Sequence, residues 1–274
     1  MTAARGGPPR RAVLPTIGPP IAVFFGFLGL WYFYSGVILD ERERNIVLPY
    51  FHKVIDVAFL DGENRSELLG AMGISTIISV VGLIIAIILG VGIAVAMSQA
   101  EWVEQSFYPY AVLLQTVPIL ALVPLIGLRF GFGITARVIV CVLIALFPII
   151  TNTLFGLKSA KSSHHDLFTL HNASRFIRLT RLQLPAALPA MFTGFQISAG
   201  LSIVGAIVGG FFFGRGDPGL GIRIKEYSAR LKVEQLIGSI ILSALLGVLA
   251  FWLFGYLKHR LTSEWDESGA ERRT

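Results

Sequence analysis

The sequence is poor in charged residues. Only 15% of its 274 residues are Asp, Glu, Lys or Arg, and 54% are hydrophobic, whereas soluble domains contain about 25% charged residues. A soluble fold would have to bury uncharged stretches at least as long as the ~20 apolar residues that span the hydrocarbon layer of a bilayer. The composition therefore excludes an ordinary soluble protein and points to a membrane protein.

Cysteine is almost absent as well. The single cysteine, Cys141, lies inside an apolar run, so there is no disulfide framework and no cysteine-based metal or redox motif. The net charge is +6, but the basic residues are scattered among loops rather than clustered in the patch that nucleic-acid binding needs. We therefore expect no metal site and no nucleic-acid partner.

A phosphate-binding loop is also missing. The sequence has no Gly-x-x-x-x-Gly-Lys-Ser/Thr pattern, so the chain cannot hold nucleotide phosphates in the P-loop manner. Its long apolar runs contain no carboxylate, Lys or Arg, although proton-coupled carriers generally use a buried ionisable residue as a relay. Work driven by ATP would therefore need a partner, and proton coupling is disfavoured. Coupling to Na⁺ through backbone carbonyls stays open.

What the sequence does contain is a series of long uncharged runs. A charge at mid-membrane costs roughly 2.5 to 3.5 kcal/mol on insertion scales, so repeated charge-free runs predict membrane spans. The runs lack the alternation of barrel strands, which makes them helices. We expect an all-α polytopic membrane protein with a transmembrane domain over residues 17–261 between an N-terminal tail, 1–16, and a polar C-terminal tail, 262–274. The six expected spans cover about 17–39, 72–98, 106–128, 137–157, 187–213 and 236–257.

A short amphipathic segment separates the first two spans. Apolar residues from Tyr50 to Ala58 recur at helical spacing opposite His52, Lys53 and Asp56, which predicts a short helix. It could lie at the membrane interface or pack against the ends of the spans. Charge counting barely orients the chain, and only the basic residues before the first span and after the fourth favour an internal N-terminus.

Polar residues and prolines inside the spans are candidates for a transport pathway. A proline removes a backbone hydrogen bond and bends a helix, and a gated passage needs bent helices. Polar side chains could instead form hydrogen bonds between helices, and both interpretations stay open. The candidates are Gln115, Thr116, Pro118, Pro124, Pro148, Asn152, Gln196 and Ser198. Gly205 and Gly209, four residues apart, favour close helix packing within the chain over a dimer contact.

The loop 158–185 is the strongest local signal. Ser163 followed by Asp166 resembles a capping box and predicts a short helix that runs to about His171. Asn172 tolerates the left-handed conformation and should end that helix. We expect a second helix from there toward Leu184, stopped by Pro185.

Apolar side chains are scattered through this polar loop, among them Leu167, Leu170 and Phe176. An exposed helical hairpin with apolar residues favours docking into a groove of another protein. The alternative is an amphipathic surface loop whose arginines meet lipid phosphates.

The loop resembles the signature of the permeases of binding-protein-dependent ABC importers, which reads Glu-Ala-Ala, three residues, Gly, nine residues, Ile, one residue, Leu-Pro. The spacing is the same throughout, although Asp replaces Glu, Asn replaces Gly, and a bulkier pair replaces Ala-Ala. The matched positions are Asp166, Leu167 and Phe168, then Asn172, then Leu182, then Leu184 and Pro185. Asn172, Ala173 and Ser174 are similar to the family's usual Gly-Ala-Ser.

The resemblance extends over about residues 68–261, and these residues look like the sulfonate, taurine and nitrate branch of type I importers. The stretches that carry it are 117–125, 130–133, Phe147-Pro148-Ile149 with Asn152-Thr153, 184–189 and Gly219-Leu220-Gly221. Where that branch often has an acidic residue ahead of Gly-Leu-Gly, this chain has Gly209 and Gly210.

The resemblance implies a non-enzymatic permease subunit in a bacterial plasma membrane that forms a dimer, usually with an identical copy. An external solute-binding protein would deliver a sulfonate, taurine, nitrate or vitamin precursor. Two cytoplasmic ABC ATPases, which use ATP and magnesium, would dock on the loop through the matched residues, Ala173, Ser174 and Arg175 included. The permease itself would hold no cofactor.

Two other classes remain as alternatives. A self-sufficient secondary carrier would need an ion site at mid-membrane, which the charge-free spans do not indicate. A membrane-embedded enzyme would need a catalytic cluster at a membrane face, for which His164, His165 and Asp166 are the candidates. We interpret these three as loop residues.

Overall fold

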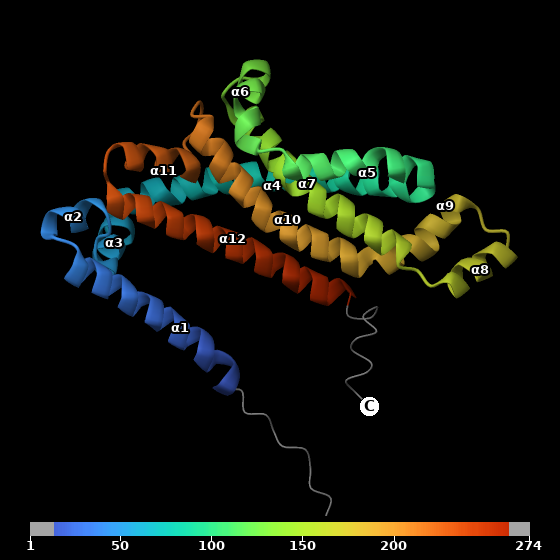
Figure 1. The fold of residues 1–274 in the computed structure, drawn as a ribbon, viewed down its shortest axis with the longest axis horizontal. Helices are drawn as coiled ribbons and strands as arrows, with labels where there is room; N and C mark the ends of the chain where they lie inside the picture. Colours follow the sequence, from blue (N-terminus) through green and yellow to red (C-terminus); the bar gives the residue numbers. More distant parts are fainter. Residues whose placement is uncertain (1–13, 263–274) are drawn as a thin grey trace, which may run out of the picture.

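The computed structural model describes residues 14–262, and within that range it contains helices and connecting turns but no strand. The predicted tails lie outside the described residues, except at their inner edges, where the first helix already begins at Leu14 and the last ends at Thr262. Most of the helices run along one long axis (Figure 1).

Five long helices make up most of the structure. They are α1 (Leu14–Phe33, continued by the π-helical turn η1, Tyr34–Ile38), α4 (Gly62–Gln99), α7 (Ile134–Lys158), α10 (Leu184–Phe212) and α12 (Val233–Thr262). Within the described range, five segments are long and apolar enough to cross a membrane, or six if the bent pair α5 (Glu101–Thr116) and α6 (Ile119–Phe130) is one span. The predicted all-α polytopic fold is thereby confirmed.

The third predicted span, 106–128, is not one continuous helix. α5 and α6 differ in direction by 98°, and α6 projects away from the long axis (Figure 1). Val117 and Pro118 between them are extended, because proline has no N–H to donate and disfavours the helical conformation of the residue before it. Pro124 and Pro148 lie inside α6 and α7 without such a break. Only one of the three prolines therefore interrupts its helix.

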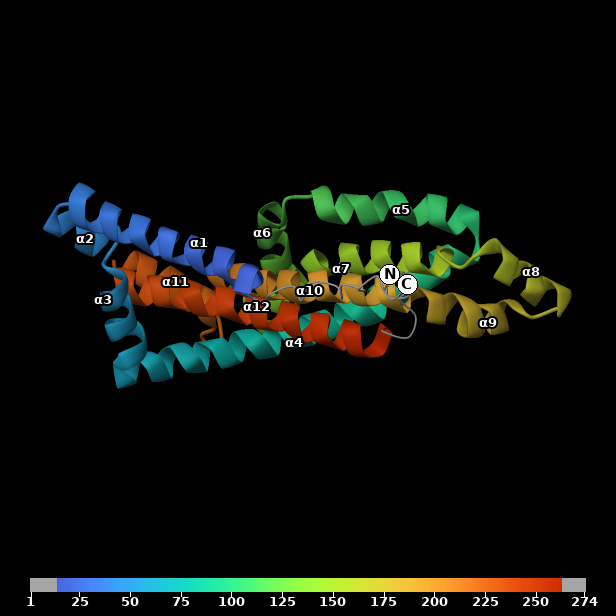
Figure 2. The same ribbon diagram turned by 90° about the horizontal axis from the view of Figure 1, so that it is seen from below.

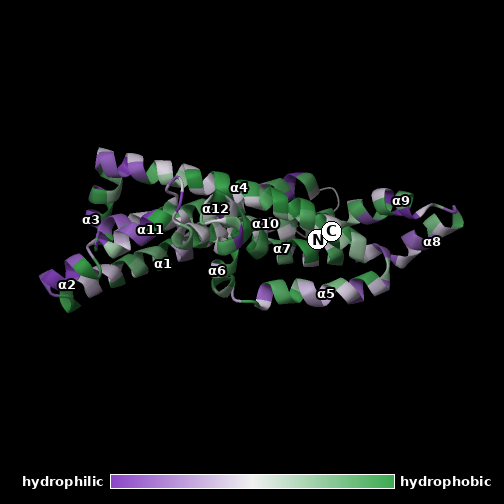
Figure 3. Ribbon diagram, turned by 90° about the horizontal axis from the view of Figure 1, so that it is seen from above, coloured by the Kyte–Doolittle hydropathy of each residue, from purple (hydrophilic) through white to green (hydrophobic). Residues whose placement is uncertain are grey.

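The shorter helices gather at the two ends of the long axis. α2 (Glu41–Ile46), α3 (Phe51–Ile55) with the π-helical turn η2 (Asp56–Leu60), and α11 (Leu220–Ala229) lie at one end, and α8 (Ser162–Leu170) and α9 (Arg175–Arg178) at the other (Figures 1 and 2). Hydrophilic residues concentrate toward these ends and hydrophobic ones between them (Figure 3). This distribution is that of a protein whose middle lies in lipid.

The amphipathic segment after the first span packs against the long helices. Val54 and Ala58 are fully buried, and a Cβ on Gly238 of α12 would lie only 2.5 Å from the Cβ of Ala58. Of the two interpretations left open by the sequence, packing against the ends of the spans is correct.

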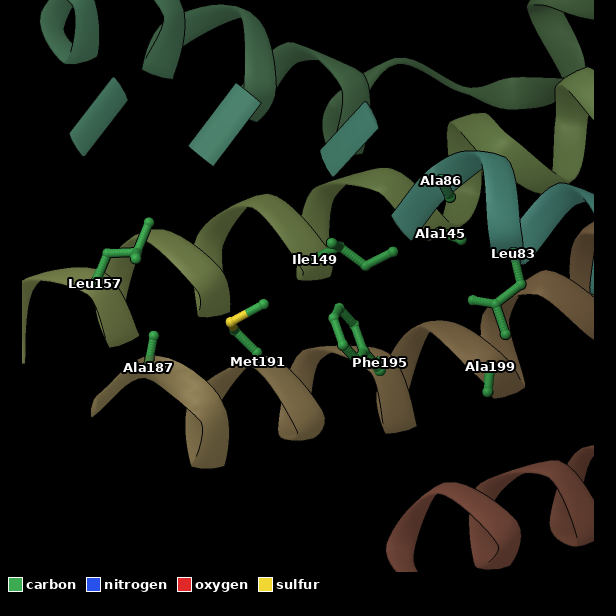
Figure 4. Packing of buried hydrophobic residues seen from close by; sticks show 9 residues of the cluster. All are labelled: Leu83, Ala86, Ala145, Ile149, Leu157, Ala187, Met191, Phe195 and Ala199. Carbon is green, nitrogen blue, oxygen red and sulfur yellow. The ribbon is translucent and has the colours of Figure 1, made fainter. Parts of the chain in front are cut away.

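The core lies where α4, α7 and α10 meet. Figure 4 shows Met191 and Phe195 of α10 pointing toward α7, where Ile149 and Leu157 are fully buried. α7 and α10 approach closely, since a Cβ on Gly205 would lie 2.7 Å from the Cα of Cys141. The spacing of small residues on α10 therefore serves packing within the chain. By contrast, α1 is almost unburied.

Candidate functional site

The segment from Ser159 to Gln183, here called the hairpin, joins α7 to α10 and projects beyond them (Figure 1). Its first arm is α8, whose N-cap residue is Lys161, without a side-chain capping bond. The predicted capping box is wrong, because Ser163 and Asp166 both lie inside the helix, which begins earlier than the pattern suggested. Both side chains are exposed, so Asp166 can reach a partner but does not set the start of α8.

Asn172 makes the turn of the hairpin, as the sequence predicts. Its φ is +49°, a left-handed conformation that asparagine adopts more readily than most residues with a side chain. The N–H of Ala173 donates to the oxygen of Phe168 at 2.9 Å, and the N–H of Asn172 to that of Thr169 at 3.0 Å. These bonds satisfy the last carbonyls of α8 in the way that left-handed C-terminal caps do.

The second arm is tied back to the first. The hydroxyl of Ser174 caps α9 by accepting from the N–H of Ile177 at 3.3 Å. The guanidinium of Arg178 donates to the hydroxyl of Thr169 on α8 at 2.9 Å, while its Nε is buried without a partner among the described residues. The two arms therefore form one unit rather than an open loop.

The second arm also runs into α10 without interruption. α9, the π-helical turn η3 (Leu179–Gln183) and α10 follow one another directly, so the predicted stop at Pro185 is wrong. The N–H of Leu184 bonds to the oxygen of Leu179, which is the wider π-helical pattern. Pro185 follows this turn directly, and the shifted hydrogen bonding of the π-helical turn accommodates its missing N–H. The second arm and α10 are therefore one continuous helical segment.

The base of the hairpin is tightly packed. A Cβ on Gly156 of α7 would lie 2.9 Å from the backbone of Ala187 of α10, so no side chain fits between the two helices there. Lys158, the last residue of α7, forms an ion pair with Glu104 of α5. Leu182 of η3 is also buried. The hairpin is therefore anchored where α7 and α10 pack closely.

The hairpin carries large apolar side chains that nothing in the described part of the chain covers. The exposed fraction is 77% for Leu170, 72% for Phe176 and 53% for Leu167. Asp166 and Arg175 are exposed on the same hairpin. Side chains of this kind at the end of a rigid pair of short helices are suited to insertion into a groove of another protein.

The predicted pathway residues are only partly brought together. Gln115 and Pro148 line one cavity of about 260 Å³ between the α5–α6 break, α7 and α10. Ser198 is buried and donates to the oxygen of Ala145 at 2.7 Å, and Gln196 donates to the oxygen of Phe251 at 3.2 Å. These two side chains join helices, which was the alternative interpretation.

The other four candidates do not line this cavity. The amide of Asn152 donates to the oxygen of Pro148 one turn earlier, at 2.8 Å. Thr116 and Pro118 are exposed at the α5–α6 break, and Pro124 is exposed on α6.

Arg137 was not predicted to be a functional residue. Arg137, at the edge of the fourth predicted span, is fully buried and donates to three backbone oxygens that lie 76 to 80 residues later in the chain. An arginine in the first turn of an apolar span was a signal for such a contact, but its partners could not be read from a pattern.

Comparison with known proteins shows the family to which this chain belongs. Residues 82–263 match the family of binding-protein-dependent transport system inner membrane components. The formylaminopyrimidine transport permease protein of Halalkalibacterium halodurans is 36% identical over 171 residues, which is 62% of this chain and 68% of that protein. The nitrate import permease protein of Leptolyngbya laminosa is 26% identical over 247 residues, or 90% of this chain and 88% of that protein.

A further relative has a different solute in its name. The riboflavin transport system permease protein of Chloroflexus aurantiacus is 32% identical over 168 residues, 61% of this chain and 62% of that protein. The family match and these relatives agree with the hairpin signature and the membrane-spanning fold. The chain therefore belongs to the binding-protein-dependent transport system inner membrane components, as a non-enzymatic, multi-pass permease subunit of type I ABC importers of the nitrate- and sulfonate-like branch in the bacterial plasma membrane.

Proposed function

We propose that this permease works with two cytoplasmic ABC ATPases, which dock on the hairpin, and takes its solute from an external binding protein. The observation that carries the proposal is the combination of exposed Leu170 and Phe176 with a second arm that continues into α10. A groove on an ATPase would cover the apolar residues, and closure of the ATPase pair would move the hairpin and α10 together.

The hairpin in this proposal lies on the cytoplasmic side, and the matched residues have distinct roles. The matched residues Leu167 and Phe168 fill the groove together with Leu170 and Phe176. Asp166 and Arg175 are the charges at its rim, which set orientation more than affinity. Asn172 with Ala173 and Ser174 fixes the angle between the arms, while Leu184 and Pro185 join the second arm to α10.

A second copy of the chain completes the passage. The α5–α6 pair carries uncovered apolar residues, with Leu120, Leu125 and Leu128 between 56% and 80% exposed. The cavity lined by Gln115 and Pro148 opens beside this pair. Two copies that met along α5 and α6 would place two such cavities near a common axis, with Thr116, Pro118, Pro124 and Asn152 close by.

The solute is a small anionic or heteroaromatic molecule of the sulfonate, taurine, nitrate or vitamin-precursor kind. The support is the names of the relatives, which transport a formylaminopyrimidine, riboflavin and nitrate. The cavity beside Gln115 is mostly apolar, which suits a solute held by few polar contacts. Screening the purified binding protein against these classes by calorimetry identifies the solute.

Reconstitution tests the proposal. The permease, its ATPase and its binding protein are placed in vesicles, and uptake of the solute is measured with ATP, without ATP and without the binding protein. We expect uptake only when all components and ATP are present. Recovery of the permease alone from its native membrane, together with uptake that ATP depletion does not affect, would instead support a secondary carrier and overturn the proposal.

A further inference from the structure

Arg137 holds three backbone oxygens at the end of the α7–α10 pair opposite the hairpin. Its Nε donates to the oxygen of Phe213 at 2.9 Å, one terminal nitrogen to that of Asp217 at 2.9 Å, and the other to that of Arg215 at 2.6 Å. We call Arg137 and these three carbonyl groups the clamp. The clamp joins the first turn of α7 to the segment 213–219, which connects α10 with α11.

The clamp lies within a wider set of close contacts. The N–H of Arg215 donates to the oxygen of Phe132, in the turn between α6 and α7, at 3.0 Å. A Cβ on Gly209 of α10 would lie 3.1 Å from the Cα of Arg137. The N–H of Leu220 donates to the hydroxyl of Ser75 on α4 at 2.9 Å. Segment 213–219 is therefore fixed to α7 by hydrogen bonds and stands between α10 and α11.

An arginine is needed for this geometry. The guanidinium is planar and directs its donors outward in a fixed fork, whereas a lysine ammonium is a point charge on a flexible stem. A buried cation is unfavourable unless its donors are satisfied, and here the partners are neutral carbonyls rather than a carboxylate in contact. Apolar residues would hold two helices together without the cost of burying a cation. The use of arginine therefore indicates that the clamp fixes one specific arrangement of α7 and segment 213–219.

We propose that Arg137 is a positioning residue that makes α7 and α10 move as one body during transport. The hairpin joins the two helices at one end and the clamp joins them at the other, so a push on the hairpin tilts the pair instead of spreading it. The same movement carries segment 213–219, and in the reverse direction a binding protein that presses on this segment acts on the hairpin. This inference rests on the proposed function.

The test uses the complete complex of permease, ATPase and binding protein in vesicles. The ATPase rate per assembled complex is measured without the binding protein and with the solute-loaded binding protein. Arg137→Met removes all three bonds, and Arg137→Lys keeps the charge but not the fork. We expect both variants to keep the basal ATPase rate. The stimulation by the loaded binding protein should fall about tenfold, which is within the usual range for coupling between sites.

A matched control keeps the clamp intact. Arg215 contributes its backbone oxygen and N–H to these contacts, so Arg215→Ala should retain full stimulation when the loaded binding protein is at a saturating concentration. A purely structural role for Arg137 would lower the yield of complex and both rates together, leaving the ratio of stimulated to basal rate unchanged. That unchanged ratio would overturn the proposal.

A second pair of variants tests the clamp if the complex with Arg137→Met does not assemble. Gly216 has φ +93°, whereas Gly214 has an ordinary backbone conformation with nothing near its Cβ position. Both are exposed. Gly216→Ala strains the clamped segment, so it should reduce the stimulation severalfold, and Gly214→Ala should not. Equal stimulation in the two variants, in a complex whose wild type couples ATP to uptake, would contradict the clamp and leave the proposed function standing.

Discussion

At the clamp end of the α7–α10 pair, polar groups are paired within the chain, whereas at the hairpin end apolar side chains are left uncovered. Arg137 is fully buried with its donors bonded to three oxygens, while Leu170 and Phe176 are more than two-thirds exposed. A finished polar network fixes a geometry. An exposed apolar surface needs a partner. The difference agrees with our proposals that the clamp fixes the arrangement of the two helices and that the hairpin docks on an ATPase.

The largest effect is expected at the hairpin. Leu170→Asp and Phe176→Asp place a charge on the surface that we propose docks on the ATPase. Each should weaken co-purification of the ATPase by about tenfold or more, since central apolar anchors dominate interfaces. Both side chains are exposed, so the yield and thermal stability of the permease should not change.

Leu231→Asp is the matched control for these variants. Leu231 is 63% exposed at the opposite end of the molecule, between α11 and α12. It should leave ATPase binding unaffected. If all three variants bound the ATPase equally, the hairpin would not be the docking surface.

The next effect is expected where α7 and α10 pack against each other, between the hairpin and the clamp. Gly205→Ala would push a methyl group to within 2.7 Å of the Cα of Cys141, and such overpacking costs about 1 to 3 kcal/mol. Gly200 on the same helix has free space around it, so Gly200→Ala should be neutral or slightly stabilising. Thermal unfolding in detergent compares the two. A similar shift for both would show that α7 and α10 are not closely packed.

A smaller effect is expected at the turn of the hairpin. Asn172→Gly should preserve ATP-driven uptake, because glycine adopts a φ of +49° freely. Asn172→Val should reduce uptake about threefold to tenfold, since a left-handed conformation costs roughly 1 to 2 kcal/mol for a residue with a bulky side chain. Uptake assays in vesicles measure both. Normal uptake by the valine variant would argue against a fixed angle between the arms.

The smallest effect belongs to Tyr227 of α11, on the same end as the clamp. Its hydroxyl donates to Glu67 of α4 at 2.8 Å, and Arg223 pairs with the same carboxylate at 2.6 Å. Tyr227→Phe should lower the stability by about 1 kcal/mol, the usual net value of one hydrogen bond. Thermal unfolding detects the loss. No change would mean that this bond adds nothing to the clamp end.

The stability contributed by the Tyr227 hydroxyl should also depend on pH. Burial, together with the neighbouring Glu67 carboxylate, raises the pKa of the Tyr227 hydroxyl above its ordinary value. The unfolded chain then loses this proton first, so the stabilising contribution is present below about pH 10, the ordinary tyrosine pKa, and is lost as the pH rises further. Tyr227→Phe should remove that part of the alkaline decline in stability.

Local features of the molecule could be predicted from the sequence. The membrane-spanning helices follow from uncharged runs, and the turn at Asn172 follows from the conformational preference of asparagine. Both depend on a few neighbouring residues. The stop predicted at Pro185 was wrong because a π-helical turn before it absorbs the missing bond.

Features that depend on distant contacts could not be predicted. The partners of Arg137 lie 76 to 80 residues away in sequence, and no spacing indicates which carbonyls a buried guanidinium will meet. The role of Ser198 was undecided for the same reason, since its bond is to the oxygen of Ala145 on another helix. The direction of α6 depends on how the chain resumes after Pro118, which composition does not specify.

Cross-linking from the hairpin tests the central claim most directly. A photoreactive amino acid replaces Phe176, which is exposed on the second arm, and the complex is illuminated in native membranes. The account predicts cross-links to a cytoplasmic ABC ATPase that change in yield when ATP is trapped. Cross-links to lipid or to a protein on the outer face, with none to an ATPase, would contradict it.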